Sequence, residues 1–197
     1  MHGSHSIRAS FDERLNQIIP RLTSDELLNN SGLGNEIGFY IFDYPPEKEL
    51  EVRKHIHFIL EYLAKKRPDL RISHVNLFQL VVDYLGSRNL LDRAVKTQQQ
   101  QGDQALLKAL KAPLAADRIA HFFIQEARPN ENDLVLVSGV GNVWPLLRSH
   151  NLLNNLHPLM GNTPLLMFYP GVFTGQGLRL FGRLKESNYY RAFRLVP

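Results

Sequence analysis

The residues whose types and spacing could support chemistry gather around one glycine-rich turn, Ser138-Gly139-Val140-Gly141-Asn142. The turn follows four apolar residues at 134–137 and precedes Trp144-Pro145 and Arg148. In α/β proteins a glycine turn between a strand and a helix can bind a phosphate, because backbone N–H groups and the start of the helix face the anion. The possible ligand site therefore consists of Gly139, Gly141, Asn142 and Arg148, together with Asp43 from the end of another predicted strand.

The known phosphate-binding motifs are incomplete at this turn. A P-loop requires a Gly-Lys pair, and the chain contains none. The dinucleotide fingerprint requires a third glycine where Trp144 stands. A structural turn beside an exposed arginine is therefore favoured, and a degenerate nucleotide-binding module using Gly139-Val140-Gly141 remains the alternative.

Candidate catalytic groups are equally sparse. Ser138 follows a predicted strand, but it lacks the preceding glycine of the G-x-S-x-G nucleophile motif. Asp43 ends another predicted strand and is the carboxylate best placed to face the same edge as Gly139, although catalysis would need a second acid or a metal. The chain has no Cys and eight scattered His, without an H-E-x-x-H pattern. We expect no catalytic site, no metal and no cofactor.

Positive charge is concentrated near the C-terminus. Residues 139–197 contain six Lys and Arg against one Glu, whereas residues 1–138 are nearly neutral. Arginines and tyrosines are enriched at interface hot spots, and the same mixture suits single-stranded nucleic acid. Packing of the aromatic side chains on the sheet edge is the structural alternative, and DNA binding is the weakest interpretation. The candidate partner-binding residues are Arg179, Arg183, Tyr189, Tyr190, Arg191 and Arg194.

The elements that must position these residues alternate along the chain. Four predicted strands at 38–42, 70–75, 134–137 and 164–169 are separated by amphipathic helices, which indicates a three-layer α/β fold with a mainly parallel sheet. The helix after the glycine turn should begin at Asn142 or Val143, with Pro145 in its first turn. Pro170-Gly171 should end the fourth strand, and 178–184 with 189–196 should form an antiparallel hairpin at one edge.

The organisation indicated is one domain over residues 1–197, with a helical segment at 1–30 that has a disordered or tag-like start. Within that segment, Pro20 should stop the helix that begins at Phe11. No apolar run approaches the roughly 18 residues of a membrane span. The absence of Cys suits a reducing cytosol.

Several separated blocks of the chain resemble the BrxB family of BREX bacteriophage-exclusion systems. The blocks are Gly32-Leu33-Gly34-Asn35-Glu36, Phe39 to Pro46, Gly139-Val140-Gly141 with Pro145 and Arg148-Ser149-His150, Phe168-Tyr169-Pro170-Gly171, and Tyr189 to Leu195. The resemblance implies a cytoplasmic antiviral role as a non-catalytic partner of other BREX proteins. It also points to the alkaline-phosphatase-like PglZ-type protein as the first contact. The surface expected to make that contact is the terminal hairpin, joined by the turn from Gly139 to Arg148.

Overall fold

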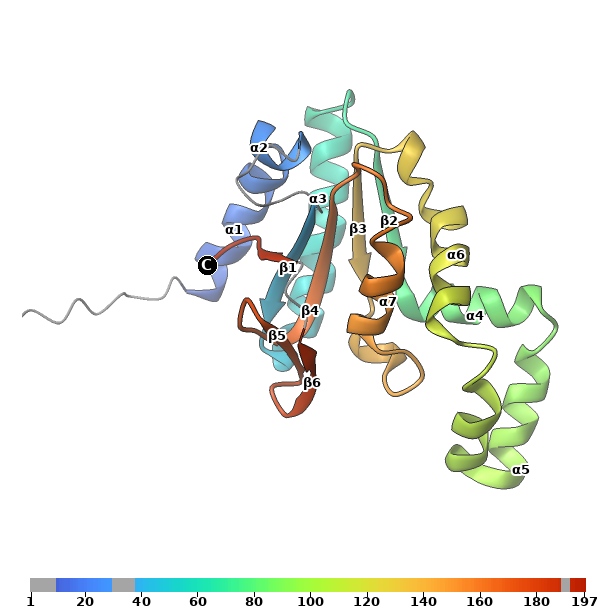
Figure 1. The fold of residues 1–197 in the computed structure, drawn as a ribbon. Helices are drawn as coiled ribbons and strands as arrows, with labels where there is room; N and C mark the ends of the chain where they lie inside the picture. The colour runs from blue at the N-terminus through green and yellow to red at the C-terminus, as the bar shows by residue number, and fades with distance from the viewer. Residues whose placement is uncertain (1–9, 30–37, 189–191) are drawn as a thin grey trace, which may run out of the picture.

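The computed structural model describes residues 10–29, 38–188 and 192–197, without the side chains of 185–188 (Figure 1). The helices are α1 (Phe11–Leu22), α2 (Asp25–Leu28), α3 (Glu49–Lys66), α4 (Leu77–Ser87), α5 (Leu91–Leu110), α6 (Ala116–Ala127) and α7 (Ser149–Leu156). Short 3-10 helices occupy Pro46–Lys48, Pro129–Glu131 and Gly141–Val143. The strands are β1 (Phe39–Tyr44), β2 (Ile72–Asn76), β3 (Leu134–Ser138), β4 (Leu165–Phe173), β5 (Gly177–Leu180), β6 (Leu184–Asn188) and β7 (Phe193–Arg194).

The sheet is mainly parallel, as the sequence predicts. Its strands run in the order β2-β3-β4-β1-β7, and each neighbouring pair in that order is parallel. The hairpin of β5 and β6 extends it, because β5 pairs antiparallel with the last residues of β4. The carboxyl ends of β1, β3 and β4 therefore meet at one edge of the sheet, which is the lower edge in Figure 1.

Helices cover both faces of the sheet and confirm the predicted three layers (Figure 1). Helices α1 and α3 pack on one face, where they meet Phe42 and Phe168. Helices α4, α6 and α7 pack on the other, where they meet Phe39 and Ile41. The alternation of side chains along β1 supplies both cores, because successive residues of a strand point to opposite faces.

Local sequence signals explain where several helices lie. Helix α3 buries apolar residues that recur at helical spacing, namely Val52, Ile56, Ile59 and Leu63. Asn76 caps α4, since its Oδ1 accepts hydrogen bonds from the backbone N–H groups of Phe78 and Gln79 at 3.0 and 3.2 Å. Such spacing and capping rules depend only on neighbouring residues, so the sequence alone is sufficient to place these elements.

Two predictions that depended on proline were wrong. Helix α1 continues through Pro20 to Leu22, because a proline in the last turn removes only one helical hydrogen bond. The helix expected at Asn142 or Val143 begins instead at Ser149. Pro145 lies outside any helix, in a cis peptide bond with Trp144 that follows the 3-10 turn.

Strand β4 does not end at Pro170-Gly171, contrary to the prediction. It pairs with β1 as far as Pro170 and with β5 from Gly171 onward. Pro170 tolerates this position because its carbonyl still accepts the N–H of Phe181 at 2.8 Å. A side chain on Gly171 would place its Cβ 2.2 Å from the Arg179 carbonyl oxygen, so glycine serves a close approach of two strands and not a chain break.

The C-terminal hairpin exists, but its predicted strands were paired incorrectly. β5 and β6 form it, with the turn at 181–183 where Phe181 and Gly182 both have positive φ angles. β7 lies apart from the hairpin and pairs parallel with β1 through Tyr40 and Ile41. The turn at 181–183 lies within the predicted strand 178–184, so the hairpin closes there. The last residues pair with β1 instead of with the hairpin.

Helix α5 extends away from the body of the molecule (Figure 1). Gly102 interrupts it with φ 80° and ψ 179°, so the helix consists of two pieces that double back on one another. Only Ala94 and Leu110 of this helix are buried. The helix breaks at this residue because glycine adopts such a conformation without strain.

Candidate functional site

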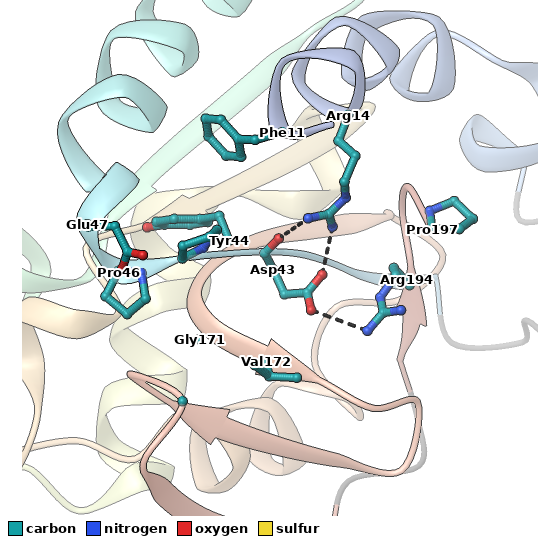
Figure 2. Close-up of a pocket in the computed structure, with 12 residues that line it drawn as sticks. Phe11, Arg14, Asp43, Tyr44, Pro46, Glu47, Gly171, Val172, Arg194 and Pro197 are labelled. Carbon is teal, nitrogen blue, oxygen red and sulfur yellow. Dashed lines mark hydrogen bonds and ion pairs between the residues drawn. The ribbon is translucent and has the colours of Figure 1, made fainter. Parts of the chain in front are cut away.

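A pocket of about 430 Å³ opens at the carboxyl ends of β1 and β4 (Figure 2). Ligands of open α/β folds usually bind at this edge of the sheet. The pocket has apolar walls and a charged interior formed by one carboxylate and two arginines. It is lined by Phe11, Arg14, Asp43, Tyr44, Pro45, Pro46, Glu47, Gly171, Val172, Gly182, Arg194 and Pro197.

Asp43 is the centre of the charged interior, and it is only 8% exposed. Arg14 Nη2 donates to its Oδ1 at 2.7 Å, while Arg194 Nη2 and the backbone N–H of Phe173 donate to its Oδ2 at 3.2 and 3.0 Å. Figure 2 shows both guanidinium groups directed at this carboxylate. The carboxylate therefore joins α1, β1, the end of β4 and β7.

This environment assigns Asp43 a structural contact within the chain. Arg14 also donates to the carbonyls of Asp43 and Val196, and Arg194 donates to the carbonyl of Phe173. The Nε atoms of both arginines are buried without a hydrogen-bond partner. Two guanidinium groups face one carboxylate, so the ion-paired cluster itself carries a net positive charge, and Glu47 adds a second carboxylate to the lining of the pocket.

The glycine turn is filled by protein side chains. Gly139 has φ +72°, and a Cβ there would meet the Asn76 side chain at 2.6 Å. A Cβ on Gly141 would meet Phe181 and Pro170 at 3.0 and 3.1 Å. The space that glycine leaves for a phosphate in nucleotide-binding turns is thus occupied here, and the turn leads into a short 3-10 helix, Gly141–Val143, while the next α-helix begins only at Ser149.

The predicted residues of the ligand turn do not converge on one point. Asn142 Oδ1 accepts a hydrogen bond from Arg53 Nη2 at 3.0 Å. Arg148 is exposed and lies one residue before α7. Asp43 reaches the same edge of the sheet as Gly139, but β4 lies between their strands. The structure consequently separates Asp43 from the glycine turn with which it was grouped.

Ser138 has a hydrogen-bond partner that the sequence did not reveal. His74 Nε2 lies 2.8 Å from Ser138 Oγ. The parallel register pairs Asn76 with Ser138, and His74, two residues before Asn76, therefore points to the same face of the sheet as Ser138. His74 is exposed to solvent as a residue. Partial desolvation of its ring, followed by electrostatic repulsion from the nearby His57, nevertheless lowers its pKa. No carboxylate of the described residues hydrogen-bonds to this imidazole, and Ser138 is buried, so the pair lacks the third group of a catalytic triad.

A second pocket, of about 510 Å³, lies beside the first and shares two of its residues. It is lined by Pro46, Glu47, Trp144, Phe181, Arg183 and Leu184. The rings of Trp144 and Phe181 meet edge to face, with centroids 6.4 Å apart. Sequence reasoning overlooked this pair as a surface feature, since nothing in the local pattern places residue 181 next to residue 144.

The predicted partner-binding residues differ in accessibility. Arg179 and Arg183 are exposed, and neither forms an ion pair with a described residue. Arg194 is half-buried against Asp43. Tyr189, Tyr190 and Arg191 lie outside the described residues.

Other classes of site find no support in the part of the chain that the structure describes. No three His, Asp or Glu side chains there are grouped as they would be around a metal ion. Across the same residues, no helix combines the length and apolar character needed to cross a membrane.

Comparison with known proteins shows the family. The family model described as "BREX protein BrxB" matches residues 73–195. A BREX protein BrxB of Escherichia coli O9:H4 (strain HS) is 44% identical over 184 residues, which cover 93% of this chain and 90% of the relative. Another, of Bacillus cereus (strain H3081.97), is 41% identical over 189 residues, covering 94% and 97%. No solved structure matches the chain with significance. The chain belongs to the BrxB family and is thus a component of a BREX bacteriophage-exclusion system.

Proposed function

We propose that this chain is a non-catalytic binding and assembly subunit of its BREX system and that it contacts the PglZ-type protein. The observation that supports the proposal best is the exposed surface formed by the β5–β6 hairpin and the neighbouring aromatics. Arg179 and Arg183 are exposed there and form no ion pair with any side chain that the structure describes, and Arg183 lines the same pocket as the exposed ring of Trp144. Arginine and tryptophan are the residue types that contribute most to protein interfaces.

The polar groups at the sheet edge support the non-catalytic part of the proposal. Asp43 is hydrogen-bonded to Arg14 and Arg194, and Ser138 is hydrogen-bonded to His74. A catalytic acid or nucleophile must face a substrate with its reacting atom. Asp43 is instead engaged by two arginines, and Ser138 is buried beside an imidazole to which no described carboxylate is hydrogen-bonded.

The choice of partner follows from family membership. Relatives that are 44% and 41% identical to this chain over the aligned residues are named as BREX proteins, so other BREX proteins are the expected partners. Among those, the PglZ-type protein is the first candidate, as the resemblance to BrxB implies. We place the interaction in the bacterial cytoplasm.

A pull-down with the PglZ-type protein tests the proposal. The variant Arg179→Glu/Arg183→Glu reverses the charge of both hairpin arginines and should strongly reduce retention of the partner. The matched control reverses Lys108 and Arg118, which are also exposed and lie on α5 and α6. If the hairpin variant retains as much partner as the control, the hairpin arginines are not the contact.

The nucleotide-binding alternative assumed a helix that begins at Asn142 or Val143, but the helix begins at Ser149. A thermal-shift screen with nucleotides tests this alternative. A ligand that binds only the folded chain raises the melting temperature by mass action. An unchanged melting temperature at nucleotide concentrations far above cellular levels therefore excludes this alternative.

DNA binding is favoured only by the net positive charge of residues 139–197. Binding to phosphates releases counterions, so the affinity would fall steeply as the salt concentration rises. A mobility-shift titration that shows no complex at low salt excludes DNA as a direct ligand.

A further inference from the structure

We infer that the two pockets at the sheet edge form one docking groove for a protein segment that carries an apolar anchor next to an acidic residue. We call this surface the edge groove and define it by Val172, Arg194, Pro46, Trp144 and Arg183. The inference rests on the proposed function, because it assumes that the chain binds another protein. It adds where that partner docks and what chemistry it presents.

The two pockets are adjacent. Both are lined by Pro46 and Glu47. On the opposite side, Gly182 lines the first pocket and its neighbour Arg183 lines the second. With volumes of about 430 and 510 Å³, each pocket is large enough to take a side chain from a partner.

The walls of the edge groove are suited to an apolar anchor. Val172 and Trp144 are 43% and 38% exposed, although both lie among buried residues of the same edge. Pro45, Pro46 and Phe11 complete the apolar part of the first pocket. An anchor seated here would remove these side chains from water, which is the main favourable contribution in most protein interfaces.

The charges of the edge groove favour a partner segment that carries an acidic residue next to its apolar anchor. Arg183 is exposed without an ionic partner among the described residues, and Arg179 lies opposite Val172 in the β4–β5 register. Arg14 and Arg194 share the single carboxylate of Asp43. Glu47 is the one exposed carboxylate that lines either pocket among the described residues. A segment with a negative charge near its anchor would therefore complement the groove.

Protein is favoured over nucleic acid as the occupant because of how these charges are arranged. Single-stranded nucleic acid is bound by a row of cations that follows the backbone, with flat rings for stacking. In the edge groove, two of the arginines are turned inward to Asp43, and the pockets between them have proline and valine walls. Such pockets accept side chains more readily than a phosphate backbone.

Site-specific photo-crosslinking tests the inference in the complete complex. We would place benzoylphenylalanine at position 172 of the tagged chain, express it with its BREX neighbours, irradiate the purified complex and identify the linked peptides by mass spectrometry. Position 95 on α5 is the matched control, because Val95 is 48% exposed against 43% for Val172. We expect a cross-link from position 172 to a partner segment with a large apolar residue and an Asp or Glu within a few positions.

Two substitutions give an independent measurement. Val172→Glu introduces a charge into the first pocket, and Arg183→Glu reverses the charge of the second. Each should weaken the affinity for the partner about thirtyfold, as loss of one interface hot spot does. Val95→Glu should leave retention unchanged, and the melting temperature of each variant establishes that it is folded.

The outcomes separate this inference from the proposed function. If the PglZ-type protein is retained but positions 172 and 95 cross-link equally, the edge groove is wrong and the assembly role stands. If position 172 links to an apolar-acidic segment of a different BREX protein, the edge groove stands and the PglZ contact is wrong. Cross-links to DNA, to a second copy of this chain or to a segment without an acidic residue overturn the inference. So does the absence of any bound BREX protein, which overturns the proposed function as well.

Discussion

The substitution Asp43→Asn removes the negative charge on which four segments of the chain converge. Arg14 and Asp43 have side chains only 15% and 10% exposed, so water cannot replace the lost ion pair. Removing one partner of a buried ion pair costs about 3–5 kcal/mol. Arg194 is 33% exposed, and solvent screening limits its added contribution to about 1 kcal/mol or less. We expect a loss of about 3–5 kcal/mol in the free energy of unfolding, out of the roughly 5–15 kcal/mol typical of a domain.

Urea denaturation followed by circular dichroism measures this loss. The control is Asp133→Asn, because Asp133 pairs with Arg71 at the surface, where their side chains are 35% and 63% exposed. Solvent screens that pair, so its removal should move the urea midpoint only slightly. A triple variant with Asp43→Leu, Arg14→Met and Arg194→Met should recover part of the stability, since no buried charge is then left unpaired.

The reasoning fails if Asp43→Asn and the Asp133 control have the same urea midpoint. That result would mean that water or chain movement compensates for the lost ion pairs of the two guanidinium groups. Asp43 would then not stabilise the contact between these segments. A change in the slope of the transition instead of its midpoint would indicate that the native state has lost compactness.

Two further predictions concern a histidine and a pair of glycines. Burial lowers the pKa of His55 below its usual 6.5, although the hydrogen bond to the Leu15 carbonyl opposes the shift. The unfolded chain then binds the extra proton first, so stability should decrease as the pH falls below about 6.5, and His55→Gln should flatten this dependence in urea titrations at several pH values. Gly171→Ala should destabilise the chain by about 1–3 kcal/mol through overpacking, because its Cβ would lie 2.2 Å from the Arg179 carbonyl. A Cβ on Gly86, in α4, would meet nothing within 4 Å, so Gly86→Ala should stabilise the chain by about 0.5–1 kcal/mol in the same assay. Equal effects of the two alanine substitutions on stability would contradict the packing argument.

The elements that could be predicted from the sequence are those specified by neighbouring residues. The buried stripe of α3 follows from helical spacing, and the start of α4 follows from the capping side chain of Asn76. The four parallel strands and the three layers follow from the alternation of strands and helices. These signals act over a few residues, so one sequence is sufficient to find them.

The predictions that failed depended on residues with two common roles. A proline is compatible with the first turn of a helix and also with a turn, and Pro145 adopts the second. A Pro-Gly pair often ends a strand, but Pro170-Gly171 marks the point where β4 changes partners. Only the packing of distant strands distinguishes these possibilities, and that information is absent from the local pattern.

The candidate site was the least predictable part of the structure. Asp43 was identified as a group at the correct edge, but its partners Arg14 and Arg194 are 29 and 151 positions away. His74 and Ser138 are separated by 64 positions and meet only through the register of β2 and β3. Alternation within adjacent strands could have suggested this second pair once the strand order was known.

The dual pairing of β4 has a practical consequence for engineering. The β5–β6 hairpin is attached to β4, whose residues 165–171 are all buried. The hairpin therefore has no exposed hinge at which it could be exchanged or removed as a unit. A graft that replaces only the turns at 174–176 or 181–183 keeps β4, β5 and β6, whereas a deletion that begins at Pro170 would cut into the central hydrophobic layer. Libraries that vary recognition in this family should therefore be confined to the loop ends, and the strand beneath should be left as it is.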